Sequence, residues 1–446
     1  MKVTIAEKVI DITESYDVAV IGGGPAGIGA AVAAARNGSK VVLIEKRGFL
    51  GGNITACYVE NAIGIIHKTL IKPWGIYKEI EEQYKQQFKW SDDVREDEAP
   101  SRYSSEYLKV FLDEFILNEG ISILLHAFVN DVVVENDEIS SVVLQTKKGA
   151  QAIKAKVIID ATGDGDVAFS AGVPFEQGRA SDGLCQPGTL NFGISGVNME
   201  IFNSGKKSLS DTSVFFVNEH MANRTGVSCK RHNPCFGRLT ASGQISYINY
   251  CDVYGIDPTD IQDLTRGEIE GRKYVMELYN YLKNNIEGME NIEITRIAPE
   301  IGFRDSRRIV GKYCLTLEDA ENSRRFDDAI AVYPRHYDML ALDGNWDKGR
   351  GFDSTALHMP VEGERSFSIP FRCLVPVKIR NLLVAGRCIS CDHIVESSIR
   401  SIIACMTTGQ AAGNAAAIAS KQGLYPGDID IQQLQGILKE QGVKLA

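Results

Sequence analysis

A glycine pattern near the N-terminus has the spacing that binds a pyrophosphate, Gly22-x-Gly24-x-x-Gly27. The apolar run 16–21 before it predicts a strand, and the alanine-rich stretch 25–37 after it predicts a helix. Glycines placed there allow a tight turn, let the backbone approach a pyrophosphate and let the helix pack on the strand. The free N–H groups and the dipole of the helix N-terminus favour phosphates. The segment therefore predicts a dinucleotide site.

An acidic residue, Glu45, closes the next apolar run. Its carboxylate would accept hydrogen bonds from the adenosine ribose hydroxyls and would disfavour a 2′-phosphate. FAD and NAD share this pattern, and the residues that follow distinguish them. Gly51 and Gly52 suit a loop that folds under a bulky, extended cofactor. Two remote segments in which an apolar run ends at glycine, 160–166 and 383–387, add further backbone approaches. Together these features predict FAD.

The order of the predicted elements indicates an α/β protein with a Rossmann-type FAD-binding domain. The β-rich runs from 122 to 159 predict a small antiparallel meander that feeds back into a parallel strand. The chain then changes in character, with scattered Arg, Asn, Cys and aromatic residues. We therefore expect an FAD-binding domain made of 1–175 and a return segment 366–446, with an α+β substrate or cap domain inserted at 176–365. Long helices are predicted at 105–118, 259–285 and 398–420, the second with Asp260 or Thr259 as its cap.

The composition limits the partners. The formal net charge of −10 over 446 residues argues against nucleic acid and against anionic membranes, because both attract basic surfaces. No apolar run approaches the roughly 18 to 20 residues of a membrane span, and no secretory signal is recognised. We expect a cytoplasmic protein with a small-molecule substrate, whose 10 cysteines are reduced thiols.

Longer segments resemble a broad family of FAD-dependent oxidoreductases. That family is related to the fumarate reductase and succinate dehydrogenase flavoproteins and, more distantly, to the flavin subunit of heterodisulfide reductase. The resemblance spans nearly the whole chain and implies FAD, without indicating a substrate. It is carried by the first 60 residues, ATGDGD at 161–166, TRGEIEGR at 265–272, FRDSRRIVGKY at 303–313, LLVAGRCIS at 382–390 and the small-residue stretch 398–419.

By this resemblance, the glycine pattern and Glu45 would hold the ADP half of FAD, and Asn53 would lie with Gly51 and Gly52 by the flavin end. Arg387 stands where many related flavoproteins have aspartate, so its contact with the ribityl chain or the pyrophosphate is open. The positions expected to contact FAD are Gly22, Gly24, Pro25, Ala26, Gly27, Glu45, Lys46, Gly51, Gly52, Asn53, Val129, Ala161, Thr162, Gly163, Asp166, Gly386, Arg387, Ser398 and Ile399.

Candidates for substrate chemistry lie in the C-terminal half. Arg304 and Arg307 belong to a dense group of guanidinium groups, whose planar forks bind carboxylates bidentately. The same group would serve equally well as an ion network at a domain interface. His393 and Arg400 lie at the start of the last predicted helix, near the expected flavin edge. We predict His393 as the acid or base, with a structural histidine as the alternative.

Two cysteines, Cys388 and Cys391, have the spacing of a redox dithiol. The pair follows a predicted flavin-binding strand and heads no thioredoxin-like unit, so we expect both thiols to pack in the core. The cysteine spacing matches no iron–sulfur cluster and no zinc site, and the sequence predicts no metal.

The favoured interpretation is an FAD-dependent oxidoreductase that exchanges a hydride between FAD and a small organic substrate, carboxylate-bearing in view of the arginines. Two alternatives stay open: a flavin-carrying electron-transfer subunit, and a flavin enzyme without redox chemistry. The sequence has no second glycine pattern for NAD(P)H. A small acceptor, oxygen or a redox partner protein would therefore complete the cycle.

Overall fold

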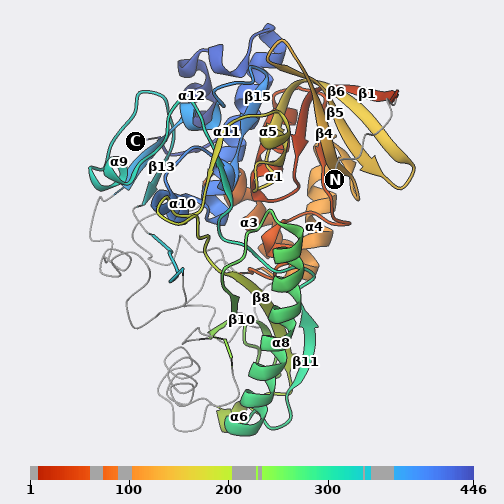
Figure 1. The fold of residues 1–446 in the computed structure, drawn as a ribbon, viewed down its shortest axis with the longest axis vertical. Coiled ribbons are helices and arrows are strands. Elements are labelled where there is room, and N and C mark those ends of the chain that lie inside the picture. Colours follow the sequence, from red (N-terminus) through yellow and green to blue (C-terminus); the bar gives the residue numbers. More distant parts are fainter. Residues whose placement is uncertain are drawn as a thin grey trace.

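The computed structural model places a large sheet and its helices at one end of the molecule and a smaller sheet with a long helix at the other (Figure 1). This arrangement confirms the α/β class. The residues that the structure describes are 9–60, 74–88, 103–202, 228–229, 234–334, 337–342 and 366–445.

The main sheet has the strand order β3-β2-β1-β6-β5-β4, and β15 pairs with the C-terminal end of β6. The neighbours β3, β2, β1 and β6 run parallel, as does β15, whereas β5 and β4 form the predicted antiparallel meander. The central strands are apolar because helices and loops cover both faces. The bounds are β1 Ile12–Ile21, β2 Val41–Ile44, β3 Ser122–Leu124, β4 Phe128–Glu135, β5 Glu138–Thr146, β6 Gly149–Asp160 and β15 Leu382–Val384.

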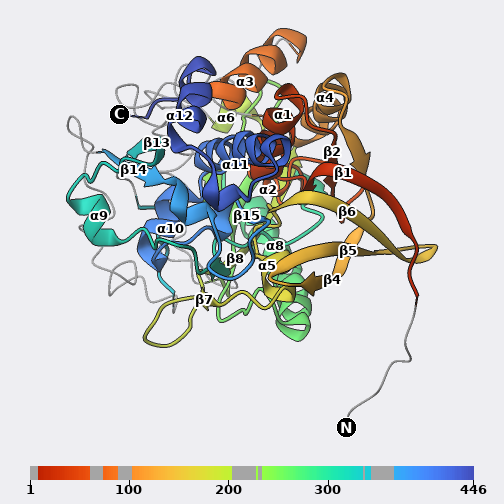
Figure 2. The same cartoon turned by 90° about the horizontal axis from the view of Figure 1, so that it is seen from above.

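Two helices, α1 (Pro25–Arg36) and α11 (Ile402–Gln422), lie side by side against this sheet (Figure 2). Their backbones are nearly in contact because small residues face each other. A Cβ atom on Gly409 would lie 1.9 Å from the Ala26 carbonyl oxygen, and one on Gly413 would lie 2.1 Å from that of Ala30. The small-residue stretch in the sequence is therefore the surface that allows this contact.

The predicted helix at 398–420 is wrong at its start, because the chain forms two helices there. Helix α10 (His393–Ile399) ends at Arg400, and the Ser401 side chain caps α11 by accepting a hydrogen bond from the Ala404 N–H. Arg400 turns aside to hydrogen-bond Asp338. The other helices around the main sheet are α2 Asn53–Ala56, α3 Gly75–Phe88, α4 Ser105–Asn118, α5 Asp166–Ser170, α9 Leu317–Glu321 and α12 Ile431–Glu440.

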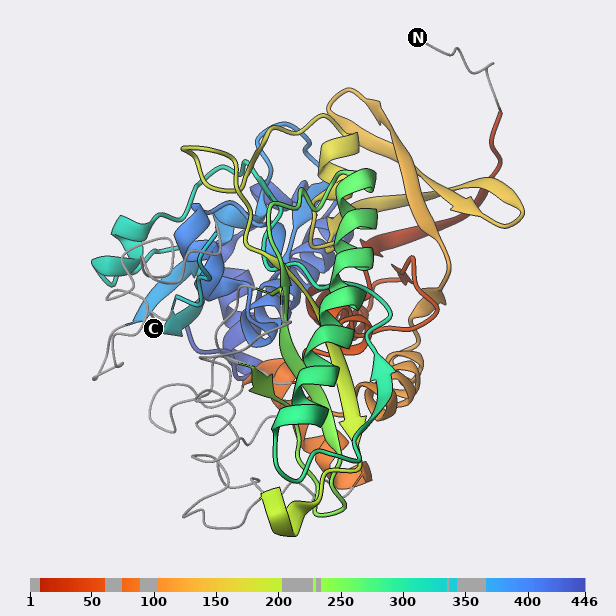
Figure 3. The ribbon, with the colours of Figure 1, turned by 60° about the horizontal axis from the view of Figure 1, so that its bottom comes forward.

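The smaller sheet has the order β11-β8-β10-β9, and the long helix α8 (Ile261–Asn285) packs along it (Figure 3). Asp260 caps α8 as the sequence predicts, accepting from the Gln262 and Asp263 N–H groups. Among the described residues, no helix is both long enough and apolar enough to cross a bilayer. The bounds are β8 Gly188–Ser195, β9 Cys235–Phe236, β10 Ile245–Val253, β11 Glu293–Ile297 and α6 Met199–Phe202.

The buried apolar side chains form a main core and a smaller core. The smaller core holds residues from Leu190 to Ile301, together with Tyr58, and from Ile309 onward the chain packs into the main core. The boundaries at 175 and 365 stay predictions, but the cores divide the chain nearer residue 305 than 365. Two short antiparallel strand pairs lie outside the two larger sheets. They are β7 Phe175–Gln177 with β12 Arg307–Ile309, and β13 Ala329–Pro334 with β14 Ser366–Pro370.

The close contact of α1 and α11 leads to a stability prediction. Gly413→Ala forces a methyl group against the Ala30 carbonyl and should destabilise the fold by about 1–3 kcal/mol, the usual cost of overpacking. Gly436→Ala is the matched control, because this α12 glycine has no atom within 4 Å of its missing Cβ and should gain about 0.5–1 kcal/mol. Thermal melts of the two variants test this. Equal melting temperatures would contradict it.

Candidate active site

A large cavity of about 750 Å³ lies where the parallel strands end. Gly22, Ala161 and Ala385 follow β1, β6 and β15 directly, and all of them line it. Because the carboxyl ends of parallel strands meet at one edge of a sheet, segments far apart in the sequence share this wall. The volume lies within the usual range of cofactor sites, about 300–1,000 Å³.

The three glycines of the pattern have different structural roles at this edge of the sheet. Gly22 has φ +104°, and a Cβ there would lie 2.4 Å from the Ala161 carbonyl oxygen. A Cβ on Gly27 would lie 1.7 Å from the Gly22 oxygen, so this glycine lets α1 pack on the turn. Gly24 has open space, with Gly52 Cα the nearest atom at 3.7 Å, and it lines the cavity. The N-cap residue of α1 is Gly24, which has no side chain to cap the helix, so the first N–H groups of α1 suit a phosphate.

Glu45 is buried beside this turn and lines the same cavity. Its carboxylate accepts hydrogen bonds from the Gly23 N–H at 2.7 Å and the Arg47 N–H at 2.9 Å. These bonds hold the carboxylate next to the start of α1. The contact with ribose hydroxyls stays a prediction.

Arg387 ties two loops together at the cavity wall. Its Nε donates to the Gly163 carbonyl at 2.9 Å, its Nη1 donates to the Phe303 carbonyl, and its Nη2 pairs with Asp164. The guanidinium therefore joins the turn after β6 to the segment that returns from the smaller core. Its contact with FAD also stays a prediction.

The remaining residues predicted to contact FAD separate into groups. Pro25, Ala26, Lys46, Gly52, Asn53, Thr162, Gly163 and Gly386 line the large cavity. Val129 and Asp166 line a narrow pocket beside it, which Glu45 and Lys46 share. Ser398 lines a neighbouring small cavity. Gly51 shapes its loop at φ +107°, and Ile399 is a fully buried core residue.

The opposite wall of the large cavity was missed by sequence reasoning. It comes from α8, the turn before it and the segment that leaves the smaller core, and only Glu268 and Phe303 lie in segments that carry the family resemblance. These residues are Pro258, Leu264, Glu268, Pro299, Glu300, Ile301 and Phe303.

The small cavity, of about 130 Å³, adjoins the large one. The shared wall consists of Asn53, Phe303, Arg400 and Ile402. Most of the other residues that line it have polar side chains, and they come from both cores. This lining includes Thr189, Asn191, Asn249, Arg304, Tyr333, Asp338, Ser397, Ser398 and Ser401.

Two of the predicted arginines line the small cavity. Arg304 donates from Nη1 to the Pro187 carbonyl at 2.9 Å and to Thr189 Oγ1 at 2.6 Å. Arg400 donates from Nη2 to Asp338 Oδ2 at 2.8 Å, and its Nε is buried without a partner among the described residues. The structure therefore brings Arg304 and Arg400 together although 95 positions separate them in the sequence.

Arg307 lies outside the small cavity. Its Nη1 is 3.0 Å from Asp166 Oδ1, and its guanidinium carbon lies 4.2 Å from the centre of the Phe169 ring. Among the described residues, Arg307 does not line the small cavity. Arg304 therefore lines the small cavity, whereas Arg307 belongs to an internal ion pair, and binding of a substrate carboxylate by Arg304 stays a prediction.

His393 begins α10 and is 9% exposed. Its Nε2 lies 2.5 Å from Asp305 Oδ2. Within the described part of the chain, it lines neither the small nor the large cavity. Its role as acid or base stays a prediction.

Cys388 and Cys391 are free thiols buried in the main core. Burial raises the pKa of both thiols well above the ordinary value. Since the thiolate is the species that exchanges electrons, this environment suits packing better than redox chemistry.

The sheet, the glycine turn and the cavity at its edge define a Rossmann-type dinucleotide-binding protein. The chain belongs to the FAD dependent oxidoreductase family, whose model matches residues 17–438. It is therefore an FAD-dependent oxidoreductase, and the cavity at the sheet edge suits this cofactor.

Similarity to individual proteins is more limited. The chain is 41% identical over 75 residues to a ferredoxin–NADP reductase of Leuconostoc mesenteroides, a match that covers 17% of this chain and 22% of that protein. It is 29% identical over 178 residues to a thiamine thiazole synthase of Desulfosudis oleivorans, covering 36% and 64%. L-proline dehydrogenase from P. horikoshii superposes with a TM-score of 0.42 at 14% identity, covering 97% and 100%.

The geometry of the glycine pattern yields a prediction about cofactor binding. Gly24→Val should fold, since the new side chain meets open space, yet it should lose FAD because that space is where the pyrophosphate would approach. Gly27→Ala should lose both fold and FAD, because its methyl group meets the Gly22 backbone. Flavin absorbance and circular dichroism of the purified variants separate these results. Full flavin content in Gly24→Val would refute the assignment.

A second prediction concerns the buried thiols. The double variant Cys388→Ala, Cys391→Ala should keep its flavin and its rate of flavin reduction, because neither thiol ionises near neutral pH. Stopped-flow reduction by dithionite and by an active substrate measures this. Loss of substrate turnover with flavin retained would instead make the pair a redox dithiol.

Proposed function

We propose that the chain exchanges a hydride between FAD and a small hydroxy- or amino-carboxylic acid held in the small cavity. The observation that carries this proposal is that Arg304, Arg400 and Asn191, whose amide oxygen is buried and unpaired among the described residues, line the same cavity. When bound, FAD supplies a two-electron acceptor or donor.

The arginines support a carboxylate. Guanidinium groups are always charged and form paired hydrogen bonds with carboxylates. Arg304 is held by Thr189 and the Pro187 carbonyl, and Arg400 is held by Asp338. These contacts fix both cations before a substrate arrives, which lowers the entropy cost of binding it.

Asn191 supports a hydrogen-bond donor on the substrate. Its Nδ2 donates to the Cys57 carbonyl at 2.7 Å, which fixes the orientation of the amide. Its Oδ1 is buried and has no hydrogen-bond partner among the described residues. A buried acceptor left unpaired costs about 1–3 kcal/mol, so a substrate hydroxyl or amine would restore that free energy.

The size of the small cavity limits the substrate. A cavity of about 150 Å³ holds a benzene molecule. The small cavity, of about 130 Å³, therefore suits a substrate of about six non-hydrogen atoms. Such a molecule would touch the shared wall, where Asn53 and Phe303 separate it from the large cavity.

Tyr333 and Ser401 complete the wall, and their hydroxyls hydrogen-bond to each other. Burial raises the pKa of Tyr333, so its hydroxyl stays protonated. We assign it to orienting the substrate by hydrogen bonds, since a group that keeps its proton is a poor base.

The electron-transfer alternative would have a redox partner protein do the substrate chemistry. The sequence motifs that resemble those of fumarate reductase flavoproteins would agree instead with a carboxylate substrate of the chain itself. Turnover by the isolated chain distinguishes the two. The purified protein should be bleached anaerobically by a member of a panel of 2-hydroxy and 2-amino acids, and bleaching by none of them would favour a partner.

Arginine variants test the carboxylate contact. Arg304→Lys keeps the charge but removes the planar fork, so KM for the active acid should rise about 10-fold or more, with normal flavin content. Arg307→Lys is the matched control from the same segment, and it should lower thermal stability while leaving KM unchanged. Steady-state kinetics and melts on both variants measure this. A larger rise of KM in Arg307→Lys would reverse the assignment.

A further inference from the structure

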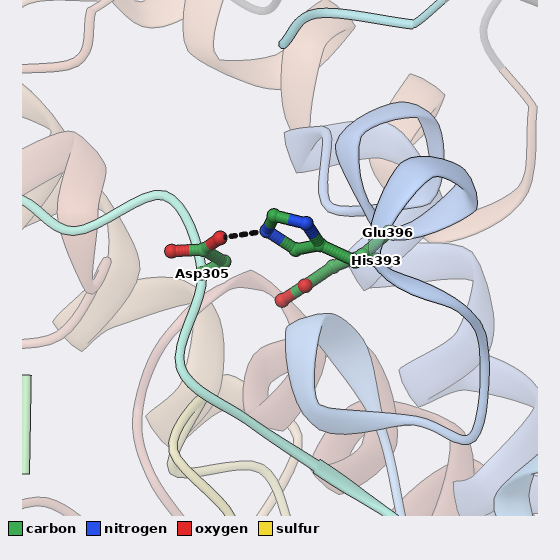
Figure 4. Close-up of side chains that lie close together, drawn as sticks. All are labelled: Asp305, His393 and Glu396. Atoms are coloured by element: carbon green, nitrogen blue, oxygen red, sulfur yellow. Dashed lines mark hydrogen bonds and ion pairs between the residues drawn. The ribbon is translucent and has the colours of Figure 1, made fainter. Parts of the chain in front are cut away.

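Three potential metal ligands converge behind the wall of the small cavity. Asp305 precedes β12, whereas His393 and Glu396 lie one turn apart on α10. Figure 4 shows the imidazole ring and both carboxyl groups directed toward one another. One ligand atom from each residue can be chosen so that all lie within 4.8 Å of one another.

The cluster is buried and rich in negative charge. Asp305 and Glu396 have no exposed surface. Arg308 is the cation nearest to Glu396, with 3.4 Å between its Nη1 and Glu396 Oε2, while Arg387 and Arg400 act on Glu396 from farther away. Burial, together with the neighbouring Asp305, raises the pKa of Glu396. Arg308 offsets the charge of one carboxylate, and the second buried carboxylate needs neutralisation by a proton or by another cation.

A proton alone leaves the cluster unsatisfied. Each oxygen of Asp305 already has a partner. Its Oδ1 accepts a hydrogen bond from the Gln186 N–H at 2.8 Å, and its Oδ2 pairs with His393. The second oxygen of Glu396, Oε1, is buried without a hydrogen-bond partner among the described residues. A proton on Oε1 would therefore have no acceptor, and one on Oε2 would face Arg308. A cation between the three side chains satisfies Oε1 directly.

We propose that Asp305, His393 and Glu396 bind a divalent transition-metal ion. One imidazole and two carboxylates suit Zn²⁺, Mn²⁺ or Fe²⁺. Neighbouring ligand atoms around such an ion lie about 3.0–3.5 Å apart, given metal–ligand distances of about 2.0–2.2 Å. The three ligand atoms here lie within 4.8 Å of one another, so side-chain movements of up to about 1–2 Å would bring them to bonding distance.

The ion would join the two parts of the small-cavity wall. Arg304 is adjacent to Asp305, and Ser397 and Ser398 follow Glu396 directly; all three line the small cavity. The three ligands themselves line neither cavity in the described part of the chain. The ion is thus a positioning element that fixes Arg304 relative to α10, and it needs no contact with FAD or substrate.

Binding of Mn²⁺ alone to the FAD-loaded, chelator-treated chain tests this proposal. Electron paramagnetic resonance reports free Mn²⁺, and oxidised flavin gives no signal. We expect one bound ion per chain, displaced by Zn²⁺, and a melting temperature that rises with Mn²⁺ because the ion binds the folded state. Glu396→Gln and His393→Gln should each weaken binding at least 10-fold.

Glu60→Gln is the matched control. Glu60 is also buried, and one of its carboxylate oxygens accepts a hydrogen bond from Arg296 at 2.6 Å. Its other oxygen has no hydrogen-bond partner among the described residues, as in Glu396, but Glu60 is not part of this cluster. This variant should bind Mn²⁺ like the wild type. Flavin content shows which variants are folded, and the wild-type titration decides the question even if a variant does not fold. Failure of the wild type to take up one ion, or equal affinity in folded Glu396→Gln, overturns the proposal.

Discussion

The close contact between α1 and α11 is the constraint on which the rest of the structure depends. Gly409 and Gly413 let the C-terminal helix lie against the backbone of the helix that begins at the glycine turn. Since α11 is fixed there, β15 pairs with β6 and places Gly386 next to Ala26. A larger residue at these glycines would push the whole return segment away from the cofactor edge.

This return makes the candidate site a composite of both ends of the chain. The N-terminal turn supplies the open backbone at Gly24, and the C-terminal segment supplies Arg387 and Arg400. The segment leaving the smaller core then closes the remaining wall at Phe303, where Arg387 donates to its carbonyl. The site thus exists only when the main core and the smaller core are packed together.

The segment from Arg304 to Arg308 distributes its side chains among several environments. Arg304 enters the small cavity, Asp305 meets His393, Arg307 joins Asp166 and Arg308 faces Glu396. A charged stretch of this kind reads as a single cluster in the sequence. In the structure Arg304 contacts β8 and Arg307 contacts α5, whereas Asp305 and Arg308 both contact α10.

The sequence by itself determined the Rossmann-type core, the cofactor class and the glycine turn, because these follow from local spacing. The 3.6-residue and two-residue periodicities are set within one element, and so are the glycines at Gly22 and Gly27 that avoid backbone clashes. It also predicted α4 and the cap of α8. Local sequence patterns were therefore sufficient to predict these individual elements.

Only the tertiary structure decided which polar residues meet. Arg304 and Arg400 share a cavity, Asn191 on β8 reaches the same cavity, and Asp305 approaches α10, although long stretches of chain separate them. Their proximity depends on how the smaller core packs against the main core. The spacing of apolar residues along the sequence does not determine that packing. The break in the predicted helix lies at Ser401, where the backbone is extended and the side chain caps α11. The sequence shows which side chains are available, but the packing of buried surfaces determines which distant side chains come together.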